Sequence, residues 1–301
     1  SFAAGKRTLY TALINQGTQL DFVIEGDSLK DYEVIYLTDA HVSRKASNAI
    51  AKWVEAGGHL FATASAGMFD ELNQPNAVLR ELLNVNQTGL DEPENSRVEM
   101  VKQDLPFAKA IDEFVLISET IKDGKSEKST KAVPIFGVRS RLNRNSHNAD
   151  IQFKSGTPAI HINKSGKGWS VYMAFLPGLT YYHTATDKIP VDRGTHAGAS
   201  SHLIPNKFSE TLNHLLGNPL FWVSPTVVCS EKLVEANIID SPKGSVVILT
   251  NWSGGPVKGL EVKLPADLAK KKLSTASGAS FIRKGRTVTL DLEVADALIL
   301  R

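Results

Sequence analysis

The sequence predicts an α/β domain built on a parallel sheet, followed by a small all-β antiparallel sandwich. Apolar runs such as Val34–Leu37 and Leu60–Ala64 lack polar alternation, and a segment of helical period joins them. Non-alternating strands connected by helices are typical of a parallel sheet that is covered on both faces. Beyond about residue 225, short strand-like runs alternate with turn residues without a helical period, which favours a sandwich.

The first ninety residues alternate between helix and strand. An apolar stripe at Leu9, Leu13 and Ile14 predicts a helix that ends at Gly17, and the run Leu20–Ile24 predicts a buried strand. Ser43 is a plausible N-cap for a second helix. We expect that helix to stop at the Gly57-Gly58 pair, because glycine tolerates the left-handed conformation of a helix C-cap.

A β-rich insertion is predicted around residues 87–165. Its polar tract, Asp123–Lys131, is expected to form a loop, since it offers no apolar face to bury. Strand-like segments at 159–163 and 169–175 flank Ser165–Gly168, which predicts a hairpin turn. We place the domain boundary near Trp222–Pro225, giving residues 1–222 and 223–301 as the two domains.

Composition excludes several classes of function. A net charge of +2 is too small for a nucleic-acid or anionic-membrane partner. The sequence contains no run of eighteen or more apolar residues, which is the length that a membrane-spanning helix needs. The single cysteine, Cys229, leaves the compartment open, with a secreted or periplasmic bacterial protein as one interpretation. The chain opens at Ser1, so we expect a piece of a longer protein or a processed one.

Several short motifs follow one another in a familiar order: Glu55-Ala56-Gly57-Gly58, Ser65-Ala66-Gly67, Asp70-Glu71 and Leu79–Val85, then Gly156–Ala159, Gly166–Gly168 and Leu176–Gly178. They resemble the middle domain of family forty-two β-galactosidases, called the β-galactosidase trimerisation domain, which has the class I glutamine amidotransferase-like (flavodoxin-like) fold. The segments Leu249–Ser253 and Ala297–Leu300 resemble the small C-terminal β-domain of these enzymes. Residues 87–155 match poorly.

The resemblance implies an accessory domain rather than a catalytic one. The catalytic glutamates of that family lie in an N-terminal barrel, and this sequence contains no barrel. Other domains or subunits of a parent glycoside hydrolase are the implied partners, with a homo-oligomer and a carbohydrate as further expectations.

Ser65 occupies the position where the wider amidotransferase-like fold carries its nucleophile, directly after a strand. A serine needs a base to activate it, and the usual His-x-Glu pair is missing from this sequence. His183 and His41 are the alternative bases. Three interpretations stay open for Ser65: a plain turn residue, a hydrolase nucleophile, or part of a small-molecule pocket.

Polar residues also follow the predicted strand ends, where α/β sheets bind ligands. Asp39, His41, Ser65 and Asp70 are therefore candidate binding residues for a small ligand or glycan, against the alternative of caps and loop ion pairs. The histidines at 183, 196 and 202 have spacings that match no standard zinc pattern, so we predict neither a metal nor a cofactor.

Asn251-Trp252-Ser253 fits the N-x-[ST] glycosylation pattern. Trp252 itself either stacks on a sugar or packs at the edge of the sandwich. The leading functional hypothesis is a non-catalytic accessory and oligomerisation module of a carbohydrate-active protein. The alternatives are a divergent serine hydrolase that uses Ser65 and a ligand-binding module at the strand ends.

Overall fold

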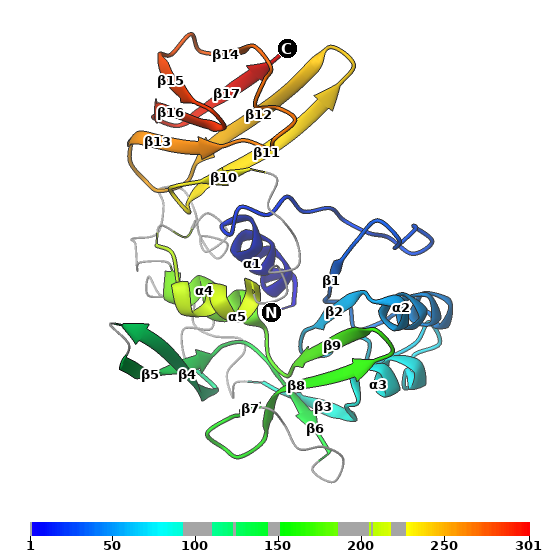
Figure 1. The fold of residues 1–301 in the computed structure, drawn as a ribbon. Coiled ribbons are helices and arrows are strands. Elements are labelled where there is room, and N and C mark those ends of the chain that lie inside the picture. Colours follow the sequence, from blue (N-terminus) through cyan, green and yellow to red (C-terminus); the bar gives the residue numbers. More distant parts are fainter. Residues whose placement is uncertain are drawn as a thin grey trace, which may run out of the picture. The chain divides into compact units, whose positions relative to one another are not determined.

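The structure is a computed structural model that describes residues 2–92, 110–122, 125–143, 151–185, 205, 207–217 and 227–301. The chain divides into two compact units (Figure 1), the first comprising residues 1–7 and 23–180 and the second residues 8–22 and 181–301. Helix α1 (Phe2–Ile14) therefore contributes residues to both. Among the described helices, none combines the length and the hydropathy of a membrane-spanning segment.

The first unit is built on a five-stranded sheet in the order β1-β2-β9-β8-β7. The bounds are β1 Val34–Leu37, β2 His59–Ala62, β9 Gly168–Met173, β8 Pro158–Ser165 and β7 Ile151–Gln152. Strands β1, β2 and β9 are parallel, whereas β8 and β7 are antiparallel to their neighbours. The prediction of a parallel sheet is therefore only partly correct. The short turn between β8 and β9 leaves no room for the crossover that parallel strands need.

Helices α2 (Arg44–Ala56) and α3 (Ala77–Leu83) cover one face of this sheet (Figure 1). The predicted cap of α2 is confirmed: Ser43 Oγ accepts the N–H of Ala46 at 3.1 Å. Gly57 ends the helix at a φ of 128°, which favours glycine. Asn76 and Asn84 cap the two ends of α3 in the same way. Local capping chemistry thus fixes both helices at the positions that the sheet requires.

Two sequence predictions of local structure are wrong. Leu20–Ile24 forms no strand, and its Phe22 and Ile24 side chains are exposed. Asp21 and Asp27 accept hydrogen bonds from the backbone of this segment, which competes with pairing in a ladder. The polar tract at Asp123–Lys131 is also not a loop, because residues 125–131 belong to a strand.

That strand forms a long antiparallel hairpin. Strand β4 (Asp112–Lys122) pairs along its whole length with β5 (Lys125–Ile135). The base of the hairpin is anchored by buried Phe114, Val133 and Ile135, and the register continues outward from there. Anchoring at one end explains how a polar tract becomes a strand despite its composition.

A separate two-stranded sheet pairs β3 (Gln87–Asp91) with β6 (Arg139–Leu142). Arg139 joins these strands to the hairpin base. Its guanidinium forms ion pairs with Asp91, at 2.9 Å, and with Asp112, donates to Ser155 Oγ at 3.0 Å, and lies 5.3 Å above the ring of Phe153. One cation thus links four segments of the first unit.

The second unit contains α5 (Glu210–Gly217), most of α4 (Pro177–Ala185) and two four-stranded antiparallel sheets. One sheet has the order β10-β13-β16-β15, with bounds Val228–Cys229, Val257–Lys263, Thr287–Leu292 and Phe281–Lys284. The other has the order β11-β12-β17-β14, with bounds Val234–Ser241, Gly244–Asn251, Ala295–Leu300 and Leu273–Thr275. The predicted sandwich is thus present.

Alternate residues of both sheets point into one shared core, which includes Val247, Leu249, Val262, Val288 and Leu298. Cys229 lies at the margin of this core in β10. Burial raises the pKa of its thiol to about 12. The interpretation of Cys229 as a packing residue agrees with this environment.

Backbone contact at Gly168 fixes β9 against the C-terminal end of α2. A Cβ at Gly168 would lie 2.1 Å from the Gly58 carbonyl oxygen and 2.2 Å from that of Val54. Both neighbours are backbone atoms that cannot rotate away. The glycine of the predicted hairpin turn is therefore required by packing.

We predict that Gly168→Ala lowers the free energy of unfolding by at least about 3 kcal/mol, since the added methyl group must displace main chain. Gly255→Ala is the matched control, because a Cβ there meets nothing within 4 Å. Urea unfolding of both variants tests this. Equal stabilities would contradict the packing argument.

Arg139 also predicts a pH dependence. Burial of Asp91 favours its neutral form, but hydrogen bonds and charge from Arg141 and Arg139 outweigh burial and hold the pKa of this carboxyl below its ordinary value. A depressed folded pKa means that the unfolded chain binds the proton more tightly. The stabilisation is complete above about pH 4 and is lost as the pH falls through the folded pKa.

Arg139→Met should therefore cost about 3–5 kcal/mol at pH 7, because it leaves the buried Asp112 carboxylate without its cation and leaves Asp91 with Arg141 alone. It should also flatten the loss of stability below pH 4. Chemical unfolding at pH 7 and pH 3 measures both effects. A variant whose stability falls as steeply with acid as the wild type would show that Arg139 does not hold Asp91 ionised.

Candidate functional site

Four of the predicted site residues lie in two loops that run side by side after β1 and β2. The Gly67 N–H donates to the Asp39 carbonyl at 2.8 Å, and the Phe69 N–H donates to that of Ala40 at 2.9 Å. Residues 41 and 69 form a parallel bridge. The structure thus brings Asp39, His41, Ser65 and Asp70 into one region at the strand ends. His183 lies in α4, in the second unit.

Asp70 is buried and acts as a loop cap. Its Oδ1 accepts the N–H groups of Leu72 at 2.9 Å and Gln74 at 2.8 Å, and its Oδ2 accepts from Arg44 Nε at 2.8 Å. The hydrogen bond from Gln74, together with those from Arg44 and Leu72, outweighs burial and lowers the pKa of this carboxyl. Asp70 therefore holds the shape of the loop that follows Phe69.

Asp39 and His41 are exposed and have local partners. Asp39 forms an ion pair with Lys6. The His41 Nε2 atom lies 2.9 Å from Asn73 Oδ1, and its ring stacks on Phe69 with a centroid distance of 5.3 Å. Each contact is one that a cap or a loop ion pair would make.

Ser65 stands in a left-handed turn, with a φ of 66°. This conformation is costly for a residue with a side chain, so the turn is held by its surroundings. The side chain is only 2% exposed, and its Oγ has no hydrogen-bond partner among the described residues. The strained backbone expected for a nucleophile is present, whereas the described part of the chain places no imidazole against this hydroxyl.

Backbone donors of the turn are all engaged. The N–H of Ser65 donates to Ser140 Oγ at 2.9 Å, that of Ala66 to the Thr63 carbonyl at 2.9 Å, and that of Gly67 to Asp39. An oxyanion hole needs such N–H groups to point at the position where negative charge develops. These three groups are committed to acceptors within the chain, so the turn offers them to no oxyanion.

A network of buried polar side chains supports this turn. The Tyr172 hydroxyl lies 2.6 Å from Ser140 Oγ and 2.7 Å from Gln87 Oε1, and Gln87 Nε2 donates to the Ala66 carbonyl at 3.0 Å. Burial raises the pKa of Tyr172, which keeps its phenol protonated as a donor. The network starts at the Ser65 N–H and returns to the Ala66 carbonyl, so it holds the Ser65-Ala66 segment at both ends.

This network was absent from the sequence predictions. Ser65 and Ser140 are 75 residues apart, and Gln87 and Tyr172 are 85 apart. No motif or period relates such positions along the chain. Tertiary packing alone reveals them.

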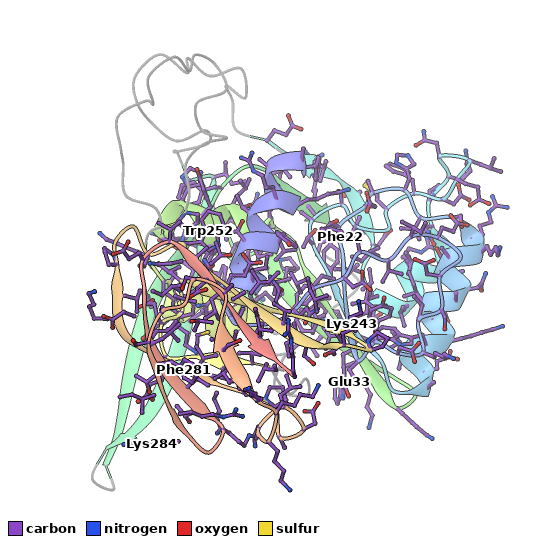
Figure 2. The ribbon with its side chains drawn as sticks, turned by 90° about the horizontal axis from the view of Figure 1, so that it is seen from above. Phe22, Glu33, Lys243, Trp252, Phe281 and Lys284 are labelled. Carbon is purple, nitrogen blue, oxygen red and sulfur yellow. The ribbon has the colours of Figure 1, made fainter. Side chains whose placement is uncertain are left out.

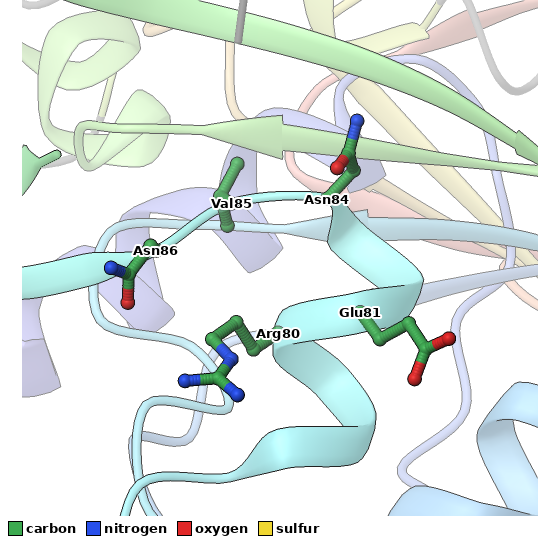
Figure 3. A pocket seen from close by; sticks show the side chains of 5 residues that line it. All are labelled: Arg80, Glu81, Asn84, Val85 and Asn86. Atoms are coloured by element: carbon green, nitrogen blue, oxygen red, sulfur yellow. The ribbon is translucent and has the colours of Figure 1, made fainter. Parts of the chain in front are cut away.

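A shallow hollow of about 290 Å³ lies at the C-terminal end of α3. It is lined by Arg80, Glu81, Asn84, Val85 and Asn86. Figure 3 shows Arg80 and Asn86 on one side of the helix and Glu81 on the other. The polar groups do not converge on a common point, as they would around a specific ligand.

The described residues contain no group of three or more His, Cys, Asp and Glu side chains placed to hold a metal ion. His196 and His202 lie outside the described residues.

The family model of the β-galactosidase trimerisation domain matches residues 4–189, which is more than half of the 301 residues. The chain therefore belongs to this family, as its motifs predicted. No curated protein sequence matches the chain.

Solved structures of GH42 β-galactosidases are similar in fold. The protein from Bacillus circulans sp. alkalophilus gives a TM-score of 0.60 at 15% identity, over 100% of this chain and 38% of its own. One from a Rahnella species gives 0.60 at 16% identity, over 98% and 36%. One from G. stearothermophilus gives 0.59 at 14% identity, over 98% and 35%. This chain thus spans little more than a third of their length.

We predict that two substitutions at the turn change the free energy of unfolding by different amounts. Tyr172→Phe should lower the free energy of unfolding by about 1–3 kcal/mol, because it removes the buried hydroxyl that bonds to both Ser140 and Gln87. Ser65→Ala should be neutral or slightly stabilising, because its buried hydroxyl has no described partner. Urea unfolding measures both. A Ser65→Ala penalty as large as that of Tyr172→Phe would show that the hydroxyl makes an essential bond.

Proposed function

We propose that this chain is a non-catalytic accessory and assembly module of a longer carbohydrate-active bacterial protein. The observation that carries the proposal is the match of residues 4–189 to a trimerisation domain. The similar structures are β-galactosidases roughly three times as long, so a parent glycoside hydrolase fits. We further propose domains at 1–222 and 223–301, the first with a flavodoxin-like, amidotransferase-like core.

The turn at Ser65, whose N–H groups all bond within the chain, supports a non-catalytic role. A hydrolase that used Ser65 would need a base at its hydroxyl and free N–H groups for the oxyanion. The turn instead commits its N–H groups to Ser140, Thr63 and Asp39. We propose that Ser65 and His183 have no catalytic role, and that Asp39, His41 and Asp70 shape the loops.

An assembly module needs an exposed surface that excludes water when it is covered. The hairpin β8–β9 offers one. Its register places Ile162 opposite Val171 and Lys164 opposite Trp169. We call these four residues the Trp169 patch. Ile162 is 44% exposed and Trp169 39%, and the ammonium group of Lys164 lies 5.6 Å from the Trp169 ring centroid.

Neighbouring residues of the hairpin show which face the patch occupies. Asn163 and Ser170 both donate to the Leu82 carbonyl of α3, at 2.9 Å and 2.8 Å. Side chains alternate between the faces of a sheet, so the Trp169 patch lies on the face away from α3. We propose that a second copy of this chain covers it, because residues 4–189 match a trimerisation domain and tryptophan is enriched at the energetic centres of interfaces.

Sedimentation velocity tests the proposal. The wild-type chain at tens of micromolar should sediment as an oligomer, and Trp169→Glu should shift it to monomer, because the interface would bury a charge. Leu72→Glu is the control, since Leu72 is exposed in the same unit but outside the patch. A wild-type chain that stays monomeric, or a Leu72→Glu variant that dissociates equally, would sink the proposed role of the patch.

A further inference from the structure

The loop after β12 is unusually well fixed for an exposed connection. Asn251 Nδ2 donates to the carbonyls of Gly255, at 2.8 Å, and Glu293, at 2.7 Å. Its Oδ1 accepts the Ser253 N–H at 2.9 Å and the Ser253 hydroxyl at 2.6 Å. The N-x-[ST] motif therefore forms a turn, and the side-chain amide of Asn251 uses both its nitrogen and its oxygen to hold the loop.

This turn presents Trp252 on the second unit. The backbone N–H of Trp252 donates to the Leu233 carbonyl at 2.8 Å, and its side chain is 38% exposed. Figure 2 shows Trp252 well separated from Phe281 and Lys284 of the other sheet. The indole is anchored through its backbone rather than buried, so the core alone does not account for it.

A carboxylate and an amide are fixed beside the indole. Trp252 Nε1 donates to Glu235 Oε2 at 3.0 Å, and Asn237 Nδ2 donates to Glu235 Oε1 at 2.7 Å. Glu235 and Asn237 are two residues apart in β11, so they share the face of the sheet that points away from the core. Each carboxylate oxygen keeps a lone pair for another donor.

The positions across the sheet from Glu235 carry short side chains, whereas Asn237 lies opposite Ile248 of β12. Glu235 lies opposite Thr250 in β12, which lies opposite Ala295 in β17. Because Thr250 and Ala295 are short, they project little from the surface of the sheet, and we call the open surface that results a shelf. We call Trp252, Glu235, Asn237, Thr250 and Ala295 the Trp252 platform.

We propose that the Trp252 platform binds a neutral hexopyranoside. An apolar C–H face of the sugar ring would lie on the indole, and hydroxyl groups would bond to Glu235 and Asn237. An aromatic face beside a few fixed polar groups provides orientation as well as contact area. The Glu235 carboxylate disfavours anionic sugars, because like charges repel. This proposal is independent of the assembly proposed for the first unit.

Affinity electrophoresis of the whole chain in gels that contain soluble β-1,4-galactan is the test. We expect galactan to retard the wild type, and excess free galactose to release it. An open shelf covers little of its ligand, so a dissociation constant on the order of 1 mM is expected. Polygalacturonate, which has a similar ring with a carboxylate, should retard the chain at least several-fold less.

Trp252→Ala should abolish the retardation. Glu235→Ala, which keeps the indole, should weaken it several-fold. Ile282→Ala is the matched control, because Ile282 is an exposed apolar residue of the other sheet. Circular dichroism checks that each variant is folded. Retardation that survives both platform variants, or that Ile282→Ala also removes, overturns the proposal, as does a wild type that galactan does not retard.

The two proposals fail separately. A chain that binds sugar but sediments as a monomer contradicts the assembly proposal alone, since the platform needs one copy. A chain that assembles but is not retarded by galactan contradicts the platform alone.

Discussion

The left-handed turn at residues 63–68 is the constraint on which much of the first unit depends. Its N–H groups donate to Ser140 of β6 and to Asp39 in the loop after β1, and its Ala66 carbonyl accepts a hydrogen bond from Gln87 of β3. Tyr172 of β9 in turn holds Ser140 and Gln87, so four segments that are distant in sequence support the turn. A backbone held at a φ of 66° needs such support, because the conformation is unfavourable by itself for a residue with a side chain. The turn therefore organises its neighbours and is in turn held by them.

The same hydrogen bonds decide what the turn can do. A backbone N–H that donates to a protein acceptor is not available to a substrate. In a catalytic turn, strain and free donors occur together. In this chain the strain is present, but the N–H groups of Ser65 and Ala66 donate to Ser140 and Thr63. Strain at a strand end thus does not by itself indicate an active site.

Elements with local causes were predictable from the sequence. The cap at Ser43, the stop at Gly57 and the hairpin at Ser165–Gly168 each follow from a few neighbouring residues. The sequence did not show that the predicted hairpin belongs to the sheet of β1 and β2, which makes that sheet mixed rather than parallel. The Tyr172 network and the links made by Arg139 could not be predicted, since their partners meet only after the strands pair.

The environment of Cys229 has a practical consequence. It is the single thiol of the chain and lies buried at the margin of the sandwich core. With a pKa near 12, the thiol is almost entirely protonated at neutral pH, and a protonated thiol reacts slowly with alkylating reagents. Rapid modification would require the two sheets to separate first. The rate of labelling therefore reports how often the C-terminal sandwich opens, without any engineered probe.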